Sequence, residues 1–176
     1  NMVLAALFAA LTAIGAFLQI PTGTVPITLQ FLFTALAGLL LGWKWGAISQ
    51  LLYVGIGLLG LPVFTQGGGI GYVLQPSFGF LLGLIPAAAV IGALTARRTG
   101  YLTVLAAVLV GDLILYAVGV PYMYLILHVY MQSAKTFSAL LAAMLVYVPG
   151  DTLKIIVVTA LAPVLRRTLA KAVPNL

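Results

Sequence analysis

Apolar runs long enough to enter a lipid bilayer dominate this sequence and leave almost no room for charge. The acidic residues are Asp112 and Asp151, and charged residues of either sign make up 6% of the 176 positions, against 64% hydrophobic residues. A soluble domain of this size could not solvate such a surface in water. We therefore predict an integral membrane protein, in which residues 1–176 form a single membrane domain without a separate soluble domain.

Short breaks rich in glycine, proline or arginine divide the apolar sequence into six predicted transmembrane helices. Some are shorter than the ~20 residues of an upright crossing, which is tolerable where loops fold back over a cavity. No internal repeat is visible, so the sequence does not indicate an inverted-repeat transporter. We expect an all-α fold with spans over about Val3–Ile20, Ile27–Leu41, Ala47–Leu61, Phe80–Ala96, Tyr101–Val120 and Gly150–Leu165, and an extra outer interfacial helix over Thr136–Tyr147.

Basic residues are concentrated in every second loop, which predicts the orientation of the helices. With an even number of spans both termini lie on one side, and we assign that side to the cytoplasm by the positive-inside rule. The outer loops then carry only Lys135, while Lys154 lies within the last span. The long loop between Pro62 and Gly79 and the start of the last span share the outer side. The inner basic residues are Lys44, Arg97, Arg98, Arg166, Arg167 and Lys171.

The chain offers little material for enzymatic or metal chemistry. It contains no cysteine, no glutamate and one histidine, which excludes disulfides and thiolate ligands and disfavours an all-protein transition-metal site. The predicted topology does not plainly bring a serine, a histidine and an aspartate together as a catalytic set. We expect a surface position for His128 and packing or capping roles for Ser49, Ser77, Ser133 and Ser138. The sequence thus favours a protein that is not an enzyme and has no cofactor.

The stretch from Val148 to Lys154 combines charge with the start of an apolar helix. A proline and a glycine open this helix, and residues three apart share a face, so Asp151 and Lys154 point the same way. Asp151 also meets the positive end of the helix dipole. It precedes Arg166 by roughly 22 Å of helix, which places the pair near the outer edge of the hydrocarbon. Charges there are costly and usually functional, although a structural ion pair or a snorkelling lysine is the alternative.

A run of glycines, Gly67–Gly71, interrupts the long outer loop. It lacks the Gly-Lys-Ser/Thr ending of a P-loop, and no strand precedes it, so it is not a nucleotide-binding loop. Glycines permit positive φ and expose N–H groups, here including those of Gly68 and Gly69, that could hold a carboxylate; the alternative is a flexible outer turn. Amides and aromatic rings near the same side could complete a small polar ligand site: Gln30, Gln66, Gln75, Phe64, Tyr72 and Phe78.

Asp112 is the second acidic residue and lies within the predicted span Tyr101–Val120. It could be a ligand or a proton-coupling group, or it could bond a hydroxyl or amide of a neighbouring helix. Of these interpretations, the structural one is favoured.

Alanines recur at four-residue spacing in the first predicted span. One line holds Ala5, Ala9 and Ala13, and the next holds Ala6 and Ala10. Small residues at this spacing let helices approach closely in lipid. On this pattern alone, an ordinary alanine-rich membrane helix is the favoured interpretation.

In combination, three stretches resemble the BioY family, the biotin-specific substrate-binding subunits (S components) of energy-coupling-factor (ECF) transporters. They are Val25–Gln30, Gly60–Phe64 with the glycines that follow, and Pro149–Lys154, and the resemblance covers nearly the whole chain. It implies six helices, cytoplasmic termini and an outer pocket in which Asp151 and Lys154 contact biotin. A carboxylate can accept hydrogen bonds from the ureido N–H groups of biotin, and an ammonium can donate to an oxygen.

The remaining ligand-binding candidates rest on the outer loop and its surroundings. The glycine run carries no basic residue to pair with the carboxylate of biotin, which departs from the simplest expectation. Backbone N–H groups or Gln75 would have to bind that carboxylate. The candidates beside Asp151 and Lys154 are therefore Gln30, Gln75, Gly68, Gly69, Phe64 and Tyr72.

The resemblance also implies partners for the chain. S components pair with a transmembrane coupling protein and two ATPase subunits in the prokaryotic plasma membrane, and this chain has no ATP-binding motif of its own. Docking is implied to use the alanine face of the first helix, where we favour Ala6 and Ala10 over Ala5 and Ala9. The alternatives are an S component for another water-soluble vitamin, a secondary transporter with Asp112 as proton carrier, and a small membrane enzyme acting on lipid.

Overall fold

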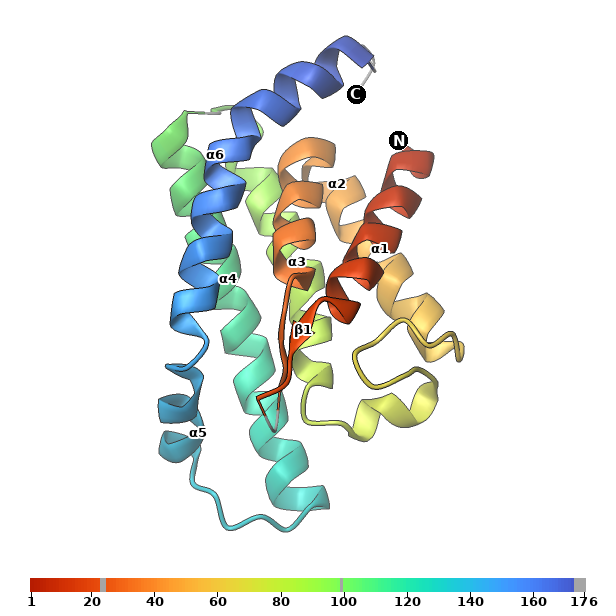
Figure 1. Ribbon diagram of the computed structural model, residues 1–176, viewed down its shortest axis with the longest axis vertical. Helices are drawn as coiled ribbons and strands as arrows, with labels where there is room; N and C mark the ends of the chain where they lie inside the picture. The colour runs from red at the N-terminus through yellow and green to blue at the C-terminus, as the bar shows by residue number, and fades with distance from the viewer. Residues whose placement is uncertain (23–24, 99, 173–176) are drawn as a thin grey trace.

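The structure is a computed structural model that describes residues 1–22, 25–98 and 100–172, and these residues are predominantly helical (Figure 1). Two short strands form an antiparallel hairpin between the first two helices. The predicted all-α class is confirmed apart from this hairpin. The elements are α1 (Met2–Phe17), β1 (Gln19–Ile20), β2 (Ile27–Thr28), α2 (Gln30–Leu58), the 3-10 turn η1 (Ile70–Leu74), α3 (Phe78–Leu94), α4 (Tyr101–Leu125), the π-helical turn η2 (Ile126–Tyr130), α5 (Phe137–Met144) and α6 (Val148–Ala172).

A sharp reversal at Gly42 divides α2 into two limbs. Gly42 has φ 77° and ψ 179°, a conformation that glycine adopts without steric cost. The limbs then pack closely, since a side chain on Gly46 would collide with the backbone of Gly38. Both predicted helices are present as these limbs, but the first begins at Gln30 and not at Ile27, which belongs to β2, and the second ends at Leu58 and not at Leu61. The turn between them is tighter than the predicted stretch 42–46.

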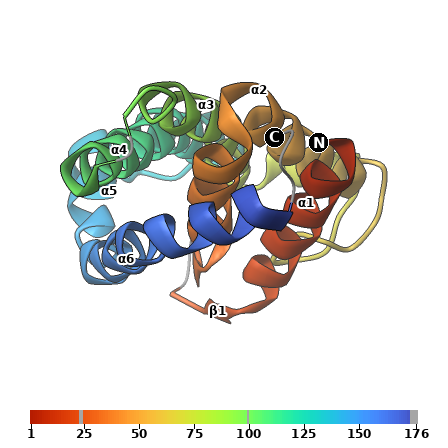
Figure 2. The same cartoon turned by 90° about the horizontal axis from the view of Figure 1, so that it is seen from above.

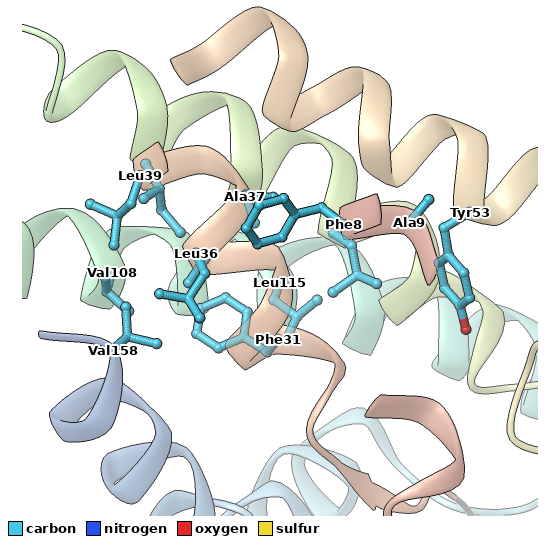
Figure 3. Close-up of a cluster of buried hydrophobic side chains, with 14 of the residues drawn as sticks. Phe8, Ala9, Phe31, Leu36, Ala37, Leu39, Tyr53, Val108, Leu115 and Val158 are labelled. Atoms are coloured by element: carbon cyan, nitrogen blue, oxygen red, sulfur yellow. The ribbon is translucent and has the colours of Figure 1, made fainter. Parts of the chain in front are cut away.

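Small residues also bring the other helices together. Figure 2 shows α3 and α4 along one side of the bundle and α1 and α6 along the other, with the first limb of α2 between them. A side chain on Gly38 would collide with the carbonyl oxygen of Ala88 in α3, and one on Gly83 would press against Leu115 in α4. Buried side chains from four helices meet in the interior, among them Phe8, Phe31, Leu36, Leu39, Val108, Leu115 and Val158 (Figure 3).

The predicted end of the first helix at Ile20 is wrong, because α1 stops at Phe17. A proline disfavours the helical conformation of the residue before it, and Pro21 thus favours an extended Ile20. The chain then pairs Ile20 with Ile27 in the hairpin. This hairpin lies beside the start of α2 and contributes to the candidate site described below.

The predicted ends of the last two spans are also wrong, at Val120 and at Leu165. Helix α4 runs through Pro121 to Leu125, and α6 runs through Pro163 to Ala172. Proline inside a helix is tolerated in membrane proteins because neighbouring groups can satisfy the freed backbone positions. Of the helix predicted over 136–147, the structure shows the shorter α5.

The two ends of the bundle carry different elements (Figure 1). The start of α1, the Gly42 turn and the end of α6 lie at one end, whereas the hairpin, the glycine-rich loop and α5 lie at the other. Arg166 belongs to the first end, where its guanidinium donates to the carbonyl oxygen of Leu39 at 2.7 Å and to Oγ1 of Thr95 at 3.3 Å. This arginine joins α6 to the ends of the first limb of α2 and of α3.

Candidate ligand-binding site

A cavity lies at the end of the bundle that carries the hairpin, and six structural regions contribute to it besides the hairpin itself. They are α2, the loop around η1, α3, α4, α5 and α6. Apolar side chains form much of the wall, namely Phe31, Phe80, Leu81, Leu84, Leu115 and Met144. The polar groups include Thr28, Gln30, Thr65, Tyr72, Ser77, Tyr116, Tyr147, Asp151 and Lys154. An apolar enclosure with a few convergent polar groups is typical of small-molecule sites.

Asp151 and Lys154 form a buried ion pair in this cavity. The Nζ atom of Lys154 lies 2.5 Å from Oδ1 of Asp151, and the two residues are 6% and 8% exposed. The first turn of α6 is formed, since the N–H of Asp151 donates to the carbonyl of Tyr147 at 2.9 Å. The i, i+3 spacing then places both side chains on the face that lines the cavity, as the sequence predicts.

Groups from two other elements hold this ion pair. The hydroxyl of Tyr116 in α4 donates to Oδ2 of Asp151, and Nζ of Lys154 donates to the carbonyl of Thr28 at 3.2 Å. Both oxygens of the carboxylate therefore have a partner, which offsets part of the cost of burying the charge. The hairpin, α4 and α6 are joined at this point.

Gln30 also lines the cavity, where its side chain has two partners. Its Oε1 accepts from the hydroxyl of Thr28 at 2.9 Å, and its Nε2 donates to the hydroxyl of Tyr53 at 2.8 Å. Tyr53 in turn donates to the carbonyl of Val63 in the glycine-rich loop at 3.1 Å. A chain of hydrogen bonds thus connects the cavity wall to that loop.

Tyr72 and Phe64 take different positions relative to the cavity. Tyr72 lines it, and its hydroxyl pairs with Thr65 at 2.9 Å. Phe64 is fully buried beneath the loop and does not belong to the lining; its ring packs on Tyr72 with centroids 4.6 Å apart and fills the space over Gly57. Phe64 therefore affects the cavity only indirectly, by packing against Tyr72.

The glycine-rich loop lies against the end of α2 and uses its own backbone donors. Gly67 and Gly69 have φ of 109° and 100°, as the glycine run predicts. The N–H of Gly69 donates to the carbonyl of Gly57 at 2.7 Å, so the predicted use of that N–H to hold a carboxylate is not compatible with this structure. Gly68 packs against the carbonyl of Leu61, and Gly68, Gly69 and Gln75 lie outside the cavity lining.

Several lining residues had no sequence pattern that predicted them. Tyr116 follows Asp112 by four residues and shares its helix face, but the partner of its hydroxyl depends on how α4 and α6 pack. Tyr147 donates to the carbonyl of Val25, a contact across more than a hundred residues. An aromatic residue just before the Pro-Gly-Asp stretch was the one available indication for Tyr147.

Asp112 and His128 do not line the cavity. Oδ1 of Asp112 is buried and has no hydrogen-bond partner among the described residues, so the predicted bond to a neighbouring hydroxyl or amide is not seen for that atom. His128 is exposed and stacks on Tyr124 with ring centroids 5.2 Å apart. Its predicted surface position is confirmed.

The two alanine lines of α1 face different surroundings. Ala5 and Ala9 are 0% and 5% exposed and belong to the core, so they are not available to a partner helix. Ala6 and Ala10 lie on the exposed side of α1. The packing of α1 on α2 thus buries the pair Ala5 and Ala9 and leaves the pair Ala6 and Ala10 exposed.

Comparison with known proteins gives a consistent family assignment. The model of the BioY family matches residues 1–171. The probable biotin transporter BioY of Lysinibacillus sphaericus is 52% identical over 78% of this chain and 71% of its own length. The biotin transporter BioY of Rhodobacter capsulatus is 38% identical over 99% of this chain and 95% of its own.

A solved structure agrees with the sequence comparisons. The crystal structure of the S component for biotin from an ECF-type ABC transporter matches this fold with a TM-score of 0.82 and 31% identity. The match covers 94% of this chain and 89% of that one. On the family model, the relatives and the fold together, the chain belongs to the BioY family.

Proposed function

We propose that this chain is the membrane-embedded biotin-binding subunit of an ECF-type ABC uptake transporter, and not an enzyme. The observation that carries this proposal is the Asp151–Lys154 ion pair, buried in a largely apolar cavity. Relatives that cover nearly the whole chain are named biotin transporters, which supports biotin as the ligand of that cavity.

The chemistry of the lining suits the two ends of biotin. Asp151 and Lys154 both line the cavity. In this proposal Asp151 accepts hydrogen bonds from the ureido N–H groups and Lys154 donates to the ureido oxygen. Apolar wall residues such as Phe80 and Leu84 suit the fused rings and the aliphatic tail. We assign the carboxylate of biotin to the hydroxyls of Thr65 and Ser77, which line the cavity. The N–H of Gly69 is not used for this, because it already donates to the carbonyl of Gly57.

The proposed topology has six membrane crossings with both termini in the cytoplasm of a prokaryotic cell. Among the described residues, α2, α4 and α6 are long and apolar enough to span a bilayer. In this proposal α4 and α6 each cross once, α2 crosses twice because it reverses at Gly42, and the shorter apolar helices α1 and α3 supply the other two crossings. The end of the bundle with Arg166 faces the cytoplasm under the positive-inside rule. The cavity then faces outward, where biotin is captured.

We further propose that an ECF module supplies the energy, through a transmembrane coupling protein and two ATPase subunits. The exposed face of α1 with Ala6 and Ala10 is the docking surface, because small side chains let a partner helix approach the backbone closely. ATP hydrolysis in the module then drives release of biotin inward.

Calorimetric titration of the purified, biotin-stripped protein tests the ligand and the site together. We expect tight binding by the parent and a loss of about 10-fold or more in Asp151→Asn and in Lys154→Ala, equivalent to about 1.4 kcal/mol. Lys135→Ala, which removes an exposed lysine outside the cavity, is the matched control and should bind like the parent.

Other outcomes separate the alternatives. Tight binding unaffected by both variants would keep the ligand and discard the site. Binding of thiamin or riboflavin in place of biotin would indicate an S component for another vitamin. Biotin accumulation in vesicles that lack ATPase subunits would indicate a secondary transporter if collapse of the proton gradient abolished it. Turnover of lipid by the purified protein would indicate a membrane enzyme.

A further inference from the structure

The hydrogen bond between Tyr116 and Asp151 fixes how α4 and α6 are aligned. The two helices run in opposite directions along the bundle (Figure 1). Asp112 precedes Tyr116 by one helical turn, and Lys154 follows Asp151 by almost one turn. Both steps lead away from the hairpin end, by about 6 Å on α4 and about 4.5 Å on α6 at the helical rise. Asp112 and Lys154 therefore lie at nearly the same depth.

The faces of the two helices also agree. Residues three or four apart lie on one side of a helix, so Asp112 shares the face of Tyr116 and Lys154 that of Asp151. Since Tyr116 and Asp151 touch, those faces are turned toward each other. Helix α3, which packs on α4 from another side, has no ionisable side chain over Phe78–Leu94.

At the depth of Asp112 and Lys154, one hydrogen-bond donor and one hydrogen-bond acceptor have no partner among the described residues. The Lys154 ammonium has three N–H donors, and the structure gives partners to two of them, Oδ1 of Asp151 and the carbonyl of Thr28. Across from it, Oδ1 of Asp112 is buried without a hydrogen-bond partner among the described residues. A buried carboxyl oxygen without a partner is costly, and more so within a membrane.

We propose that Asp112 is a positioning residue of the ligand site, which holds the Lys154 ammonium when the N–H groups of the ligand occupy Asp151. This rests on the proposed function. In the structure, each oxygen of Asp151 already accepts one hydrogen bond, with Lys154 on Oδ1 and Tyr116 on Oδ2. A ligand N–H that donates to Oδ1 along the direction that Lys154 now uses displaces the ammonium from that position. Asp112 then keeps the displaced ammonium paired and aimed at the ligand oxygen, so no buried charge is left alone.

A double-mutant cycle tests this role, with biotin as the probe and displacement of a fluorescent biotin conjugate as the readout. In the parent background, Asp112→Asn should weaken binding about 10-fold, and Asp112→Glu should recover to within about 3-fold of the parent. In the Lys154→Met background, Asp112→Asn should change affinity by less than about 2-fold, since the group it holds is gone. Tyr116→Phe, which acts through Asp151, is the matched control and should still weaken biotin binding in the Lys154→Met background.

The outcomes distinguish this inference from the proposed function. If the folded parent does not bind biotin, the proposed function and this role fall together. If the parent binds biotin but Asp112→Asn matches it, or has the same effect with and without Lys154, only the role of Asp112 is overturned. Size-exclusion profiles establish folding for each variant, and Asp112→Ser replaces Asp112→Asn in the cycle if the asparagine variant does not fold.

Discussion

Tyr116 is the side chain through which α4 reaches the ion pair. Its hydroxyl donates to Asp151, and hydrogen bonds to charged groups contribute more than neutral ones, about 1.5–3 kcal/mol. We expect Tyr116→Phe to weaken biotin binding roughly 10-fold in calorimetric titration, because the carboxylate loses the donor that orients it. Tyr124→Phe is the control, since Tyr124 stacks on His128 outside the cavity lining. An equal loss in both variants would contradict a specific role for Tyr116.

Local spacing explains which site residues could be predicted from the sequence. Asp151 and Lys154 are three apart in one helix, so their shared face follows from helix geometry alone. Tyr116 could not be predicted as their partner, because that contact depends on the alignment of two helices. The hydrogen bond of the Gly69 N–H is equally beyond prediction from the sequence, because its acceptor, the carbonyl of Gly57, lies in a different element.

At the scale of elements, the contact between α2 and α3 depends on a glycine. A side chain on Gly38 would meet the carbonyl of Ala88, so Gly38→Ala should push the helices apart and cost about 1–3 kcal/mol. Thermal unfolding in detergent measures this as a lower midpoint temperature. Gly55→Ala in the same helix, where nothing lies within 4 Å of the added carbon, should be neutral or slightly stabilising. A loss as large for Gly55→Ala would contradict the packing argument.

The helices themselves could be predicted from long apolar runs, but their ends could not. The sequence predicts a helix end before both Pro21 and Pro121. The structure has an extended hairpin at the first, whereas α4 continues through the second. Whether a proline ends a helix depends on which neighbours satisfy the freed carbonyl groups, and that is a property of the packed bundle. The same holds for the hairpin, whose two short strands have no alternation long enough to predict them.

At the scale of the whole molecule, the docking surface proposed on the exposed face of α1 is distinct from the cavity, since no residue of α1 lines it. Ala6→Leu should reduce co-purification with the coupling protein and ATPase subunits by about 10-fold while leaving biotin affinity unchanged, because its bulk blocks close helix approach. Ala117→Leu, at an exposed alanine of α4, controls for added bulk and should assemble normally. Intact assembly with Ala6→Leu would place the docking surface elsewhere.

The tethers of the glycine-rich loop have a kinetic consequence for the whole transporter. The loop is held by Tyr53 through Val63, by Tyr122 through the carbonyl of Val73, and by the N–H of Gly69. A molecule that enters or leaves past this loop has to wait until these bonds open, so the tethers slow exchange in both directions. Slow opening of the loop lengthens the time that a bound molecule stays in the cavity. A long stay in the cavity would give the coupling module proposed above time to bind the loaded subunit before the ligand escapes.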